Sequence, residues 1–159
     1  MGVSGCGKST IGKLLASKLK IEFFDADDFH PKSNIEKMQN GTPLTDHDRE
    51  GWLESIHTFS LNKVSNTSIV IACSALKERY RQTLSQDLKT KWIFLKGSYE
   101  LIRERMAARK GHYMAPSLLK SQFESLEHPK KAFIISIDKN KEDILNEIIL
   151  LLDQENLKK

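Results

Sequence analysis

Apolar positions along this chain follow two alternating patterns, and together they predict an α/β fold. Four short apolar runs are typical of strands, and they are residues 21–25, 68–72, 91–95 and 133–137. The run at 68–72 (SIVIA) is apolar without interruption, as in a strand covered on both faces. Between the runs, apolar residues recur at helical spacing, so we expect a parallel sheet with helices on both faces. Ligands of such sheets bind at the carboxyl ends of the strands.

The predicted helices differ in how clearly the sequence marks their ends. Thr45 is a candidate N-cap, with Asp46 and Asp48 in the first turn after it. The helix after Thr45 is expected to direct its apolar side chains inward, namely Trp52, Leu53, Ile56 and Phe59. Four further helices are predicted at residues 33–39, 75–84, 99–108 and 117–125. Two more are predicted from their apolar stripes, one formed by Ile11, Leu14, Leu15 and Leu19 and a last one that carries Ile144 to Leu152.

Composition and charge narrow the class of protein. The 159 residues suit a single domain with one core, and 39% hydrophobic with 29% charged residues is ordinary for a soluble protein. No apolar run approaches the ~18 residues of a membrane span. The two cysteines form no disulfide framework and no metal-ligand spacing, so we expect a protein of the reducing cytoplasm. The net charge of +4 suits anionic ligands, but the basic residues alternate with acids, which argues against a nucleic-acid partner.

The first nine residues carry the strongest motif of the chain. Residues 2–9 (GVSGCGKS) match G-x-x-x-x-G-K-[ST], the phosphate-binding loop of P-loop proteins. Its glycines let successive backbone N–H groups point at phosphates, and the helix that follows adds its positive N-terminal end. Lys8 can reach the β- and γ-phosphates, while the Ser9 hydroxyl can ligate Mg²⁺. The predicted nucleotide-binding residues are Gly2, Val3, Ser4, Gly5, Cys6, Gly7, Lys8, Ser9 and Thr10.

Two details of this loop leave alternatives open. Cys6 has either a thiol activated by the positive field of the loop or a side chain that points away, and we favour the second interpretation. Only Met1 precedes the loop, although a strand of about five residues usually does. Either the first strand is very short or the sequence is trimmed at its start, and we expect trimming. We also expect no signal peptide, because the chain enters the loop at once.

A pair of acids lies at the end of the predicted strand at residues 21–25. Asp25 and Asp27 are two residues apart, so on an extended segment their side chains point the same way. One carboxylate could hold the water shell of Mg²⁺ while the other orients a substrate hydroxyl. The alternative is a polar transition from strand to loop, where aspartate is common. Their position some 16 residues after a phosphate loop favours the functional interpretation.

Several basic residues are candidates for neutralising phosphate or substrate charge. Arg49 lies early in its helix, and Lys77 and Arg81 are four residues apart after the SIVIA run, on one predicted helix face. Any of them could be ordinary surface charge. Transfer of a phosphoryl group needs a cation near the transferring group, often an arginine from a mobile segment. Arg109, beside the break at residues 111–116, is the best single candidate, and Arg105 is its rival.

Taken together, these segments resemble the gluconokinases of the shikimate-kinase-like P-loop kinases. The matching stretches are MGVSGCGKST, FFDADDFHPKSNIEKMQNGTPLTDHDREGWL, ACSALKERYR, FLKGSYELIRERMAARKGHYMAPSLLKSQFESLE and ISID, in that order along nearly the whole chain. The resemblance implies ATP- and Mg²⁺-dependent phosphorylation of D-gluconate at its 6-hydroxyl, giving 6-phosphogluconate. It implies one three-layer P-loop kinase domain over residues 1–159, with strand order 2-3-1-4-5, a lid at about 109–125 and an adenine-contacting loop near 137–139. It also suggests a homodimer.

The resemblance further assigns roles by position. It implies that Lys8 and Ser9 keep their phosphate and Mg²⁺ duties, that Asp27 contacts the reacting hydroxyl and that Asp25 is an outer-shell partner of the metal. With Arg109 on the γ-phosphate, the catalytic residues would be Lys8, Asp27 and Arg109. The candidates for the polyol and carboxylate of gluconate are Asp27, His30, Arg49, Lys77, Arg81 and His112, with Gln122 as a weaker candidate that could instead brace the lid.

Two other functions stay open at this point. The nearer alternative is a kinase of another small acceptor, such as shikimate or a nucleoside monophosphate. The more distant one is a nucleotide-binding switch or RNA-associated ATPase, which only the basic net charge suggests. The paired acids and the Arg–Gly–His segment favour a kinase, because a switch needs no acceptor pocket.

Overall fold

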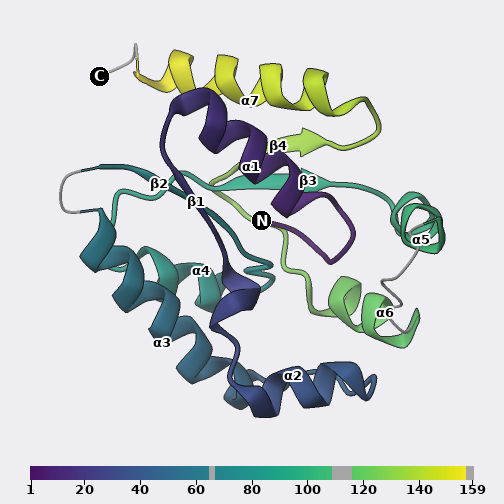
Figure 1. The fold of residues 1–159 in the computed structure, drawn as a ribbon. Helices are drawn as coiled ribbons and strands as arrows, with labels where there is room; N and C mark the ends of the chain where they lie inside the picture. The colour runs from purple at the N-terminus through teal and green to yellow at the C-terminus, as the bar shows by residue number, and fades with distance from the viewer. Residues whose placement is uncertain (65–66, 109–115, 157–159) are drawn as a thin grey trace.

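Helices alternate with short strands along the whole chain (Figure 1). The computed structural model describes residues 1–64, 67–108 and 116–156. The strands are β1 (Glu22–Asp25), β2 (Ile69–Ala72), β3 (Ile93–Lys96) and β4 (Phe133–Ser136). The helices are α1 (Lys8–Leu19), the 3₁₀ helix η1 (Ala26–Phe29), α2 (Lys32–Gln39), α3 (Asp46–Lys63), α4 (Glu78–Ser85), α5 (Tyr99–Ala107), α6 (Pro116–Ser125) and α7 (Lys141–Asn156). The predicted α/β class is therefore confirmed.

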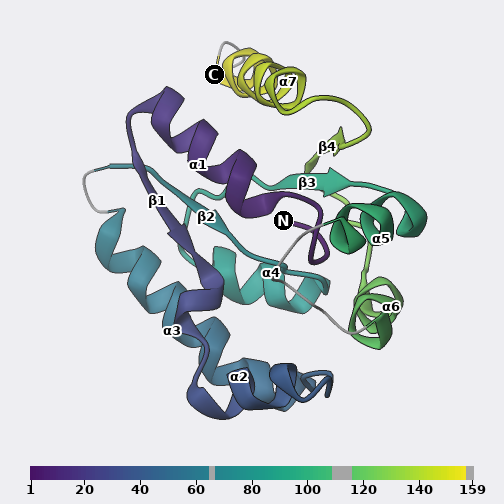
Figure 2. The ribbon, with the colours of Figure 1, turned by 45° about the vertical axis from the view of Figure 1, so that its right-hand side comes forward.

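The strands lie between two layers of helices (Figures 1 and 2). Helices α1 and α7 cover one face, and their apolar side chains pack with β3 and β4 around Leu15, Ile135 and Ile148. Helices α3 and α4 cover the other face, where Trp52 and Ile56 belong to a second buried cluster. This three-layer arrangement follows from the apolar stripe that each helix must bury. Within the described part of the chain, none of the helices combines the length and the apolar character that crossing a bilayer requires.

The strands form two parallel pairs rather than one continuous sheet. β1 pairs with β2 from Glu22↔Ile69 onward, and β3 pairs with β4 from Ile93↔Phe133 onward. Met1 and Gly2 lie between the pairs: the amine of Met1 donates to Ile93 O at 2.5 Å, and Gly2 N donates to Ser74 O, just after β2, at 3.2 Å. The centre of the expected order 2-3-1-4-5 thus holds these two residues and no assigned strand, so the continuous order stays a prediction.

The structure confirms the predicted elements with two local differences. Thr45 caps α3 as expected, and it forms a full capping box with Asp48. The helix expected at 75–84 begins only at Glu78, because residues 73–77 form a loop in which Ala75 has a φ of 44°. The SIVIA run is also less buried than expected: Ile69, Val70 and Ile71 are half-buried, and Ala72 is the one buried residue of β2.

Candidate active site

The phosphate loop wraps around the N-terminus of α1. Gly5 and Gly7 have φ values of 81° and 97°, a left-handed conformation that other residues rarely adopt. A Cβ on Gly5 would come within 2.6 Å of the Met106 side chain, whereas one on Gly7 would meet nothing within 4 Å. The loop is therefore packed at one point and open at another. Lys8, the first residue of α1, donates to Val3 O at 3.0 Å across the loop. The uncrowded backbone around Gly7, the Lys8 ammonium and the N-terminus of α1 together suit the binding of a nucleotide's phosphates.

Ser9 and Asp25 form the part of the site that suits a metal ion. The Ser9 hydroxyl donates to Asp25 Oδ2 at 2.5 Å, which joins the start of α1 to the end of β1. A hydroxyl and a carboxylate are ligands that Mg²⁺ accepts when phosphate and water complete its shell. Among the described residues, no group of three or more His, Cys, Asp or Glu side chains could hold a metal ion.

Asp27 lies in the short helix η1 and not in the extended segment that was predicted. The chain does not stay extended after Asp25 but turns into η1, because the Asp25 carboxylate accepts a hydrogen bond from Asp27 N at 3.2 Å and caps the turn. The alternation argument that put both side chains on one side was therefore wrong. Desolvation and then the like charge of Asp25 raise the pKa of Asp27, although 80% of its side chain is exposed. An accessible carboxylate with a raised pKa suits a proton acceptor.

His30 lies beside Asp27 in a nearly buried position. Its ring stacks on Trp52 with centroids 4.3 Å apart, and its Nε2 lies 4.0 Å from Asp27 Oδ1. The amide of Asn34 is 3.4 Å from the other ring nitrogen. Burial, followed by the positive charge of Arg49, lowers the pKa of His30 to about 4. The ring is thus neutral near pH 7, so it can hydrogen-bond hydroxyl groups but adds no positive charge.

A cluster of charged side chains gathers at the N-termini of α3 and α4. We call Asp46, Lys77, Arg79 and Tyr80 the Asp46 cluster. Lys77 Nζ lies 2.9 and 3.0 Å from the two oxygens of Asp46, and Arg79 and the Tyr80 hydroxyl contact the same carboxylate. Arg49 lies over the Tyr80 ring, 5.8 Å from its centroid, and donates to Leu44 O. One acid therefore holds two cations and a phenol close together at the carboxyl end of β2.

Arg81 does not join this cluster, which corrects the expectation that it shares a face with Lys77. Lys77 is the N-cap of α4 rather than a helical residue, so the four-residue spacing does not bring the two side chains together. Arg81 is 3% exposed, and its guanidinium donates to Ala75 O, Leu76 O and Glu127 O at 2.8–3.1 Å. It also pairs with Glu78. These contacts tie the loop after β2 to the segment after α6 and leave Arg81 no free donor directed at a ligand.

Residues from α5 and α6 contact the nucleotide side of the site. Gln122 accepts a hydrogen bond from the loop amide of Ser4 at 2.7 Å, so it braces the phosphate loop. Arg105 donates to Ile137 O at 2.7 Å, in the segment expected to contact adenine. Arg109 and His112 lie outside the described residues, as does the start of the predicted lid.

Sequence reasoning missed the residues that hold the others in place. Trp52 was expected only as a core residue, yet its indole N–H also donates to Ala26 O at 2.7 Å and so fixes η1. Asp46 was expected only as a helix-terminal acid. Buried Asn34 donates to Asp48 O at 2.7 Å and also contacts His30. A polar residue at a buried helical position was the one signal available for Asn34, whereas the Asp46 contacts join segments some 30 residues apart.

Known proteins of one family are similar to this chain. The family model described as Shikimate kinase matches residues 4–152. The thermosensitive gluconokinase of Escherichia coli is 46% identical over 92% of this chain and 80% of its own length, and the probable gluconokinase of Rattus norvegicus is 46% identical over 91% and 90%. The crystal structure of a gluconokinase from Sinorhizobium meliloti superposes with a TM-score of 0.89 at 38% identity, covering 99% of this chain and 93% of that one. This chain therefore belongs to the shikimate kinase family and, within it, to the gluconokinases.

Proposed function

We propose that this protein transfers the γ-phosphoryl group of ATP to the 6-hydroxyl of D-gluconate, giving 6-phosphogluconate. The similarity to proteins named gluconokinase along most of the chain carries this proposal. The site geometry supports it, because the structure has an open phosphate loop at the start of α1, an accessible carboxylate just after β1 and a cationic cluster that includes residues of the segment after β2.

The nucleotide would be held by the phosphate loop. The backbone amides of residues 2–9 and Lys8 would bind the phosphates, and Ser9, with Asp25 behind it, would hold Mg²⁺. Bound Mg·ATP supplies the phosphoryl group and neutralises part of its charge. The contribution of the chain is to fix these donors before the substrate arrives, which lowers the cost of organising charge during transfer.

Asp27 would receive the proton of the acceptor hydroxyl. Its carboxylate is open to solvent, and its raised pKa makes it a better proton acceptor than an ordinary aspartate. The neutral imidazole beside it can donate or accept a hydrogen bond from a sugar hydroxyl, which fits the polyol part of gluconate. Asp27 and His30 would thus act on the reacting end of the substrate.

The carboxylate of gluconate needs a cation, and Lys77 and Arg49 are the described residues that fit. Lys77 is held by Asp46 at the edge of the cluster with about a quarter of its side chain exposed, so it can turn a donor to an incoming carboxylate. Arg49 lies on the Tyr80 ring beside it. We assign no substrate contact to Arg81, whose donors are used within the protein.

Closure over the γ-phosphate stays a prediction. Arg109 and His112 keep the roles that the family resemblance gives them, while Gln122 and Arg105 link α6 and α5 to the described part of the nucleotide site. Exclusion of water by such a lid would limit wasteful hydrolysis of ATP.

An acceptor panel tests the proposal. ADP release is measured with Mg·ATP and D-gluconate, shikimate or a nucleoside monophosphate, with Lys8→Ala as the inactive control. We expect rapid release only with gluconate. No signal with gluconate, or a stronger one with another acceptor, would contradict the proposal, and ATP hydrolysis stimulated by RNA would point to the ATPase alternative.

Assembly and location remain predictions. The resemblance suggests a homodimer, which light scattering of the purified chain would measure. The cytoplasm is expected from the cysteine content alone.

A further inference from the structure

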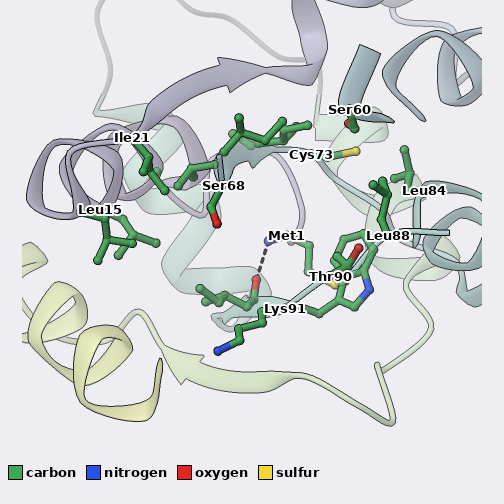
Figure 3. A pocket seen from close by; sticks show the side chains of 18 of the residues that line it. Met1, Leu15, Ile21, Ser60, Ser68, Cys73, Leu84, Leu88, Thr90 and Lys91 are labelled. Carbon is green, nitrogen blue, oxygen red and sulfur yellow. Dashed lines mark hydrogen bonds between the residues drawn. The ribbon is translucent and has the colours of Figure 1, made fainter. Parts of the chain in front are cut away.

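Asn34 of α2 is one of the few polar residues that are buried in the described part of the chain. The others are Ser60 and Arg81. Ser60 lines the pocket shown in Figure 3 and donates to Ile56 O of its own helix at 2.7 Å. Asn34 instead contacts His30 of the candidate active site. Burial of an amide is costly unless its hydrogen bonds are made, so these contacts define the role of Asn34.

The contacts of the Asn34 amide determine which way it faces. Its Nδ2 donates to Asp48 O at 2.7 Å. A backbone carbonyl has no hydrogen to give, so the group that faces Asp48 O must be the NH₂ and not the amide oxygen. The same Nδ2 lies 3.4 Å from His30 Nδ1, and two N–H groups facing each other at this distance would repel. His30 Nδ1 is therefore the acceptor and carries no hydrogen.

The ring of His30 then carries its one hydrogen on Nε2. Burial and the positive charge of Arg49 lower the pKa of His30 to about 4, so the ring is neutral near pH 7 and has a single N–H. Nε2 lies 4.0 Å from Asp27 Oδ1, and a carboxylate on that side also favours the hydrogen there. Stacking on Trp52, with the two rings 10° from parallel, holds the ring plane in place.

We propose that Asn34 is a positioning residue, which holds His30 in the Nε2–H tautomer and thereby orients the acceptor hydroxyl toward Asp27. The orienting role rests on the proposed phosphorylation of gluconate, whereas the tautomer does not. The 4.0 Å between Nε2 and Asp27 Oδ1 exceeds a hydrogen bond, but one hydroxyl oxygen can lie about 2.8 Å from both atoms. Because Nε2 donates to this oxygen, the hydroxyl must give its own hydrogen to Asp27.

This arrangement directs the proton of the hydroxyl to the carboxylate. During transfer the O–H bond breaks toward Asp27 Oδ1, the oxygen bonds to the γ-phosphorus of ATP, and ADP leaves with the electrons of the broken P–O bond. His30 keeps its hydrogen throughout. In the other tautomer the bare Nε2 would compete with Asp27 for the hydroxyl hydrogen, and the hydroxyl would lose its single orientation.

Long-range ¹H–¹⁵N NMR of the histidine rings measures the tautomer in the full chain without substrate. A ring nitrogen without hydrogen resonates far downfield of one that carries it, and His30→Gln identifies the His30 signals. At about pH 8, where the ring is neutral, we expect a bare Nδ1 and a protonated Nε2 in the unmodified protein. A hydrogen on Nδ1 would overturn the proposal, whether or not any Asn34 variant folds.

Asn34→Asp replaces the donor with an acceptor and should move the hydrogen of His30 to Nδ1. At the same pH, kcat with gluconate should fall about tenfold, the effect of one hydrogen bond, while the KM for Mg·ATP stays within about twofold. Asn40→Asp is the matched control, because it adds the same charge at the exposed C-cap of α2, and it should change neither the ring spectrum nor kcat.

Two results with Asn34→Asp would overturn the proposal: a ring spectrum that keeps the Nε2–H form, or a moved hydrogen with normal kcat. No turnover of gluconate by the unmodified protein would contradict the proposed function instead. The ring spectrum needs no substrate, so it would still decide whether Asn34 sets the tautomer.

Discussion

The phosphate loop and the Asp46 cluster both lie at the N-termini of helices, but they are built in different ways. The loop is eight consecutive residues, and its chemistry comes from backbone amides, one lysine and one hydroxyl. The cluster joins the start of α3 to the start of α4, and its chemistry comes entirely from side chains around one carboxylate. A loop made from contiguous residues can be identified in the sequence, whereas a cluster assembled by folding cannot. The two regions should also respond differently to mutation.

The largest effect is expected at the loop. Lys8→Ala removes the charge nearest to the β- and γ-phosphates, so kcat should fall about a thousandfold or more while the fold is retained. Turnover is measured with gluconate at saturation. Lys18→Ala, an exposed lysine in the last turn of α1, is the control and should be close to the unmodified protein.

A substitution of Arg81 distinguishes a structural role of this arginine from a role in binding substrate. Arg81→Met leaves three carbonyl oxygens and Glu78 without their charged donor, so the free energy of unfolding should fall by about 3 kcal/mol. The KM for gluconate should not change. Denaturant titration is the measurement, and Arg79→Met, at an exposed position, should lose less than about 1 kcal/mol. A raised KM for gluconate with an unchanged free energy of unfolding would show instead that Arg81 binds the substrate.

Asp27 belongs to neither region, and its substitution tests the proposed transfer of the hydroxyl proton. Asp27→Asn removes the proton acceptor and should lower kcat about a hundredfold, with little change in the KM for ATP. Steady-state kinetics measure both quantities, and the neighbouring Asp28→Asn is the control. Near-normal turnover by Asp27→Asn would remove this carboxylate from the mechanism.

The pH profile probes the same carboxylate. Asp27 must be ionised to accept a proton, and its pKa is raised above the ordinary value of 3.8. Activity should therefore be lost as the pH falls through a value higher than that of an ordinary aspartate. The acid limb of kcat against pH, at saturating Mg²⁺, gives this value. An acid limb at or below 3.8 would contradict the assignment.

The smallest effect is expected in the Asp46 cluster. Lys77→Met should raise the KM for gluconate about tenfold and leave kcat within about twofold, because it removes one charge-assisted contact to the carboxylate. Initial rates over a range of gluconate concentrations measure this. Lys63→Met is the control, since Lys63 pairs with Glu22 at the far end of β1. An unchanged KM would exclude Lys77 from the pocket.

The limits of prediction from sequence follow the same division between local and long-range contacts. The α/β class, the phosphate loop and the Thr45 cap depend on neighbouring residues, and they could be predicted. The turn at Ala26 could not be predicted, because it depends on the Asp25 carboxylate accepting a hydrogen bond from Asp27 N and on the Trp52 indole of α3 donating to Ala26 O. Arg81 was misjudged since its partners, near residues 75 and 127, meet only in the folded chain.

The central claim is that this protein phosphorylates gluconate at the 6-hydroxyl. ³¹P NMR of the product formed from Mg·ATP and D-gluconate tests it most directly. We predict one new phosphomonoester signal, coupled to the two hydrogens on C6 and absent with Lys8→Ala. No phosphomonoester, or a phosphate attached to another carbon, would contradict the account.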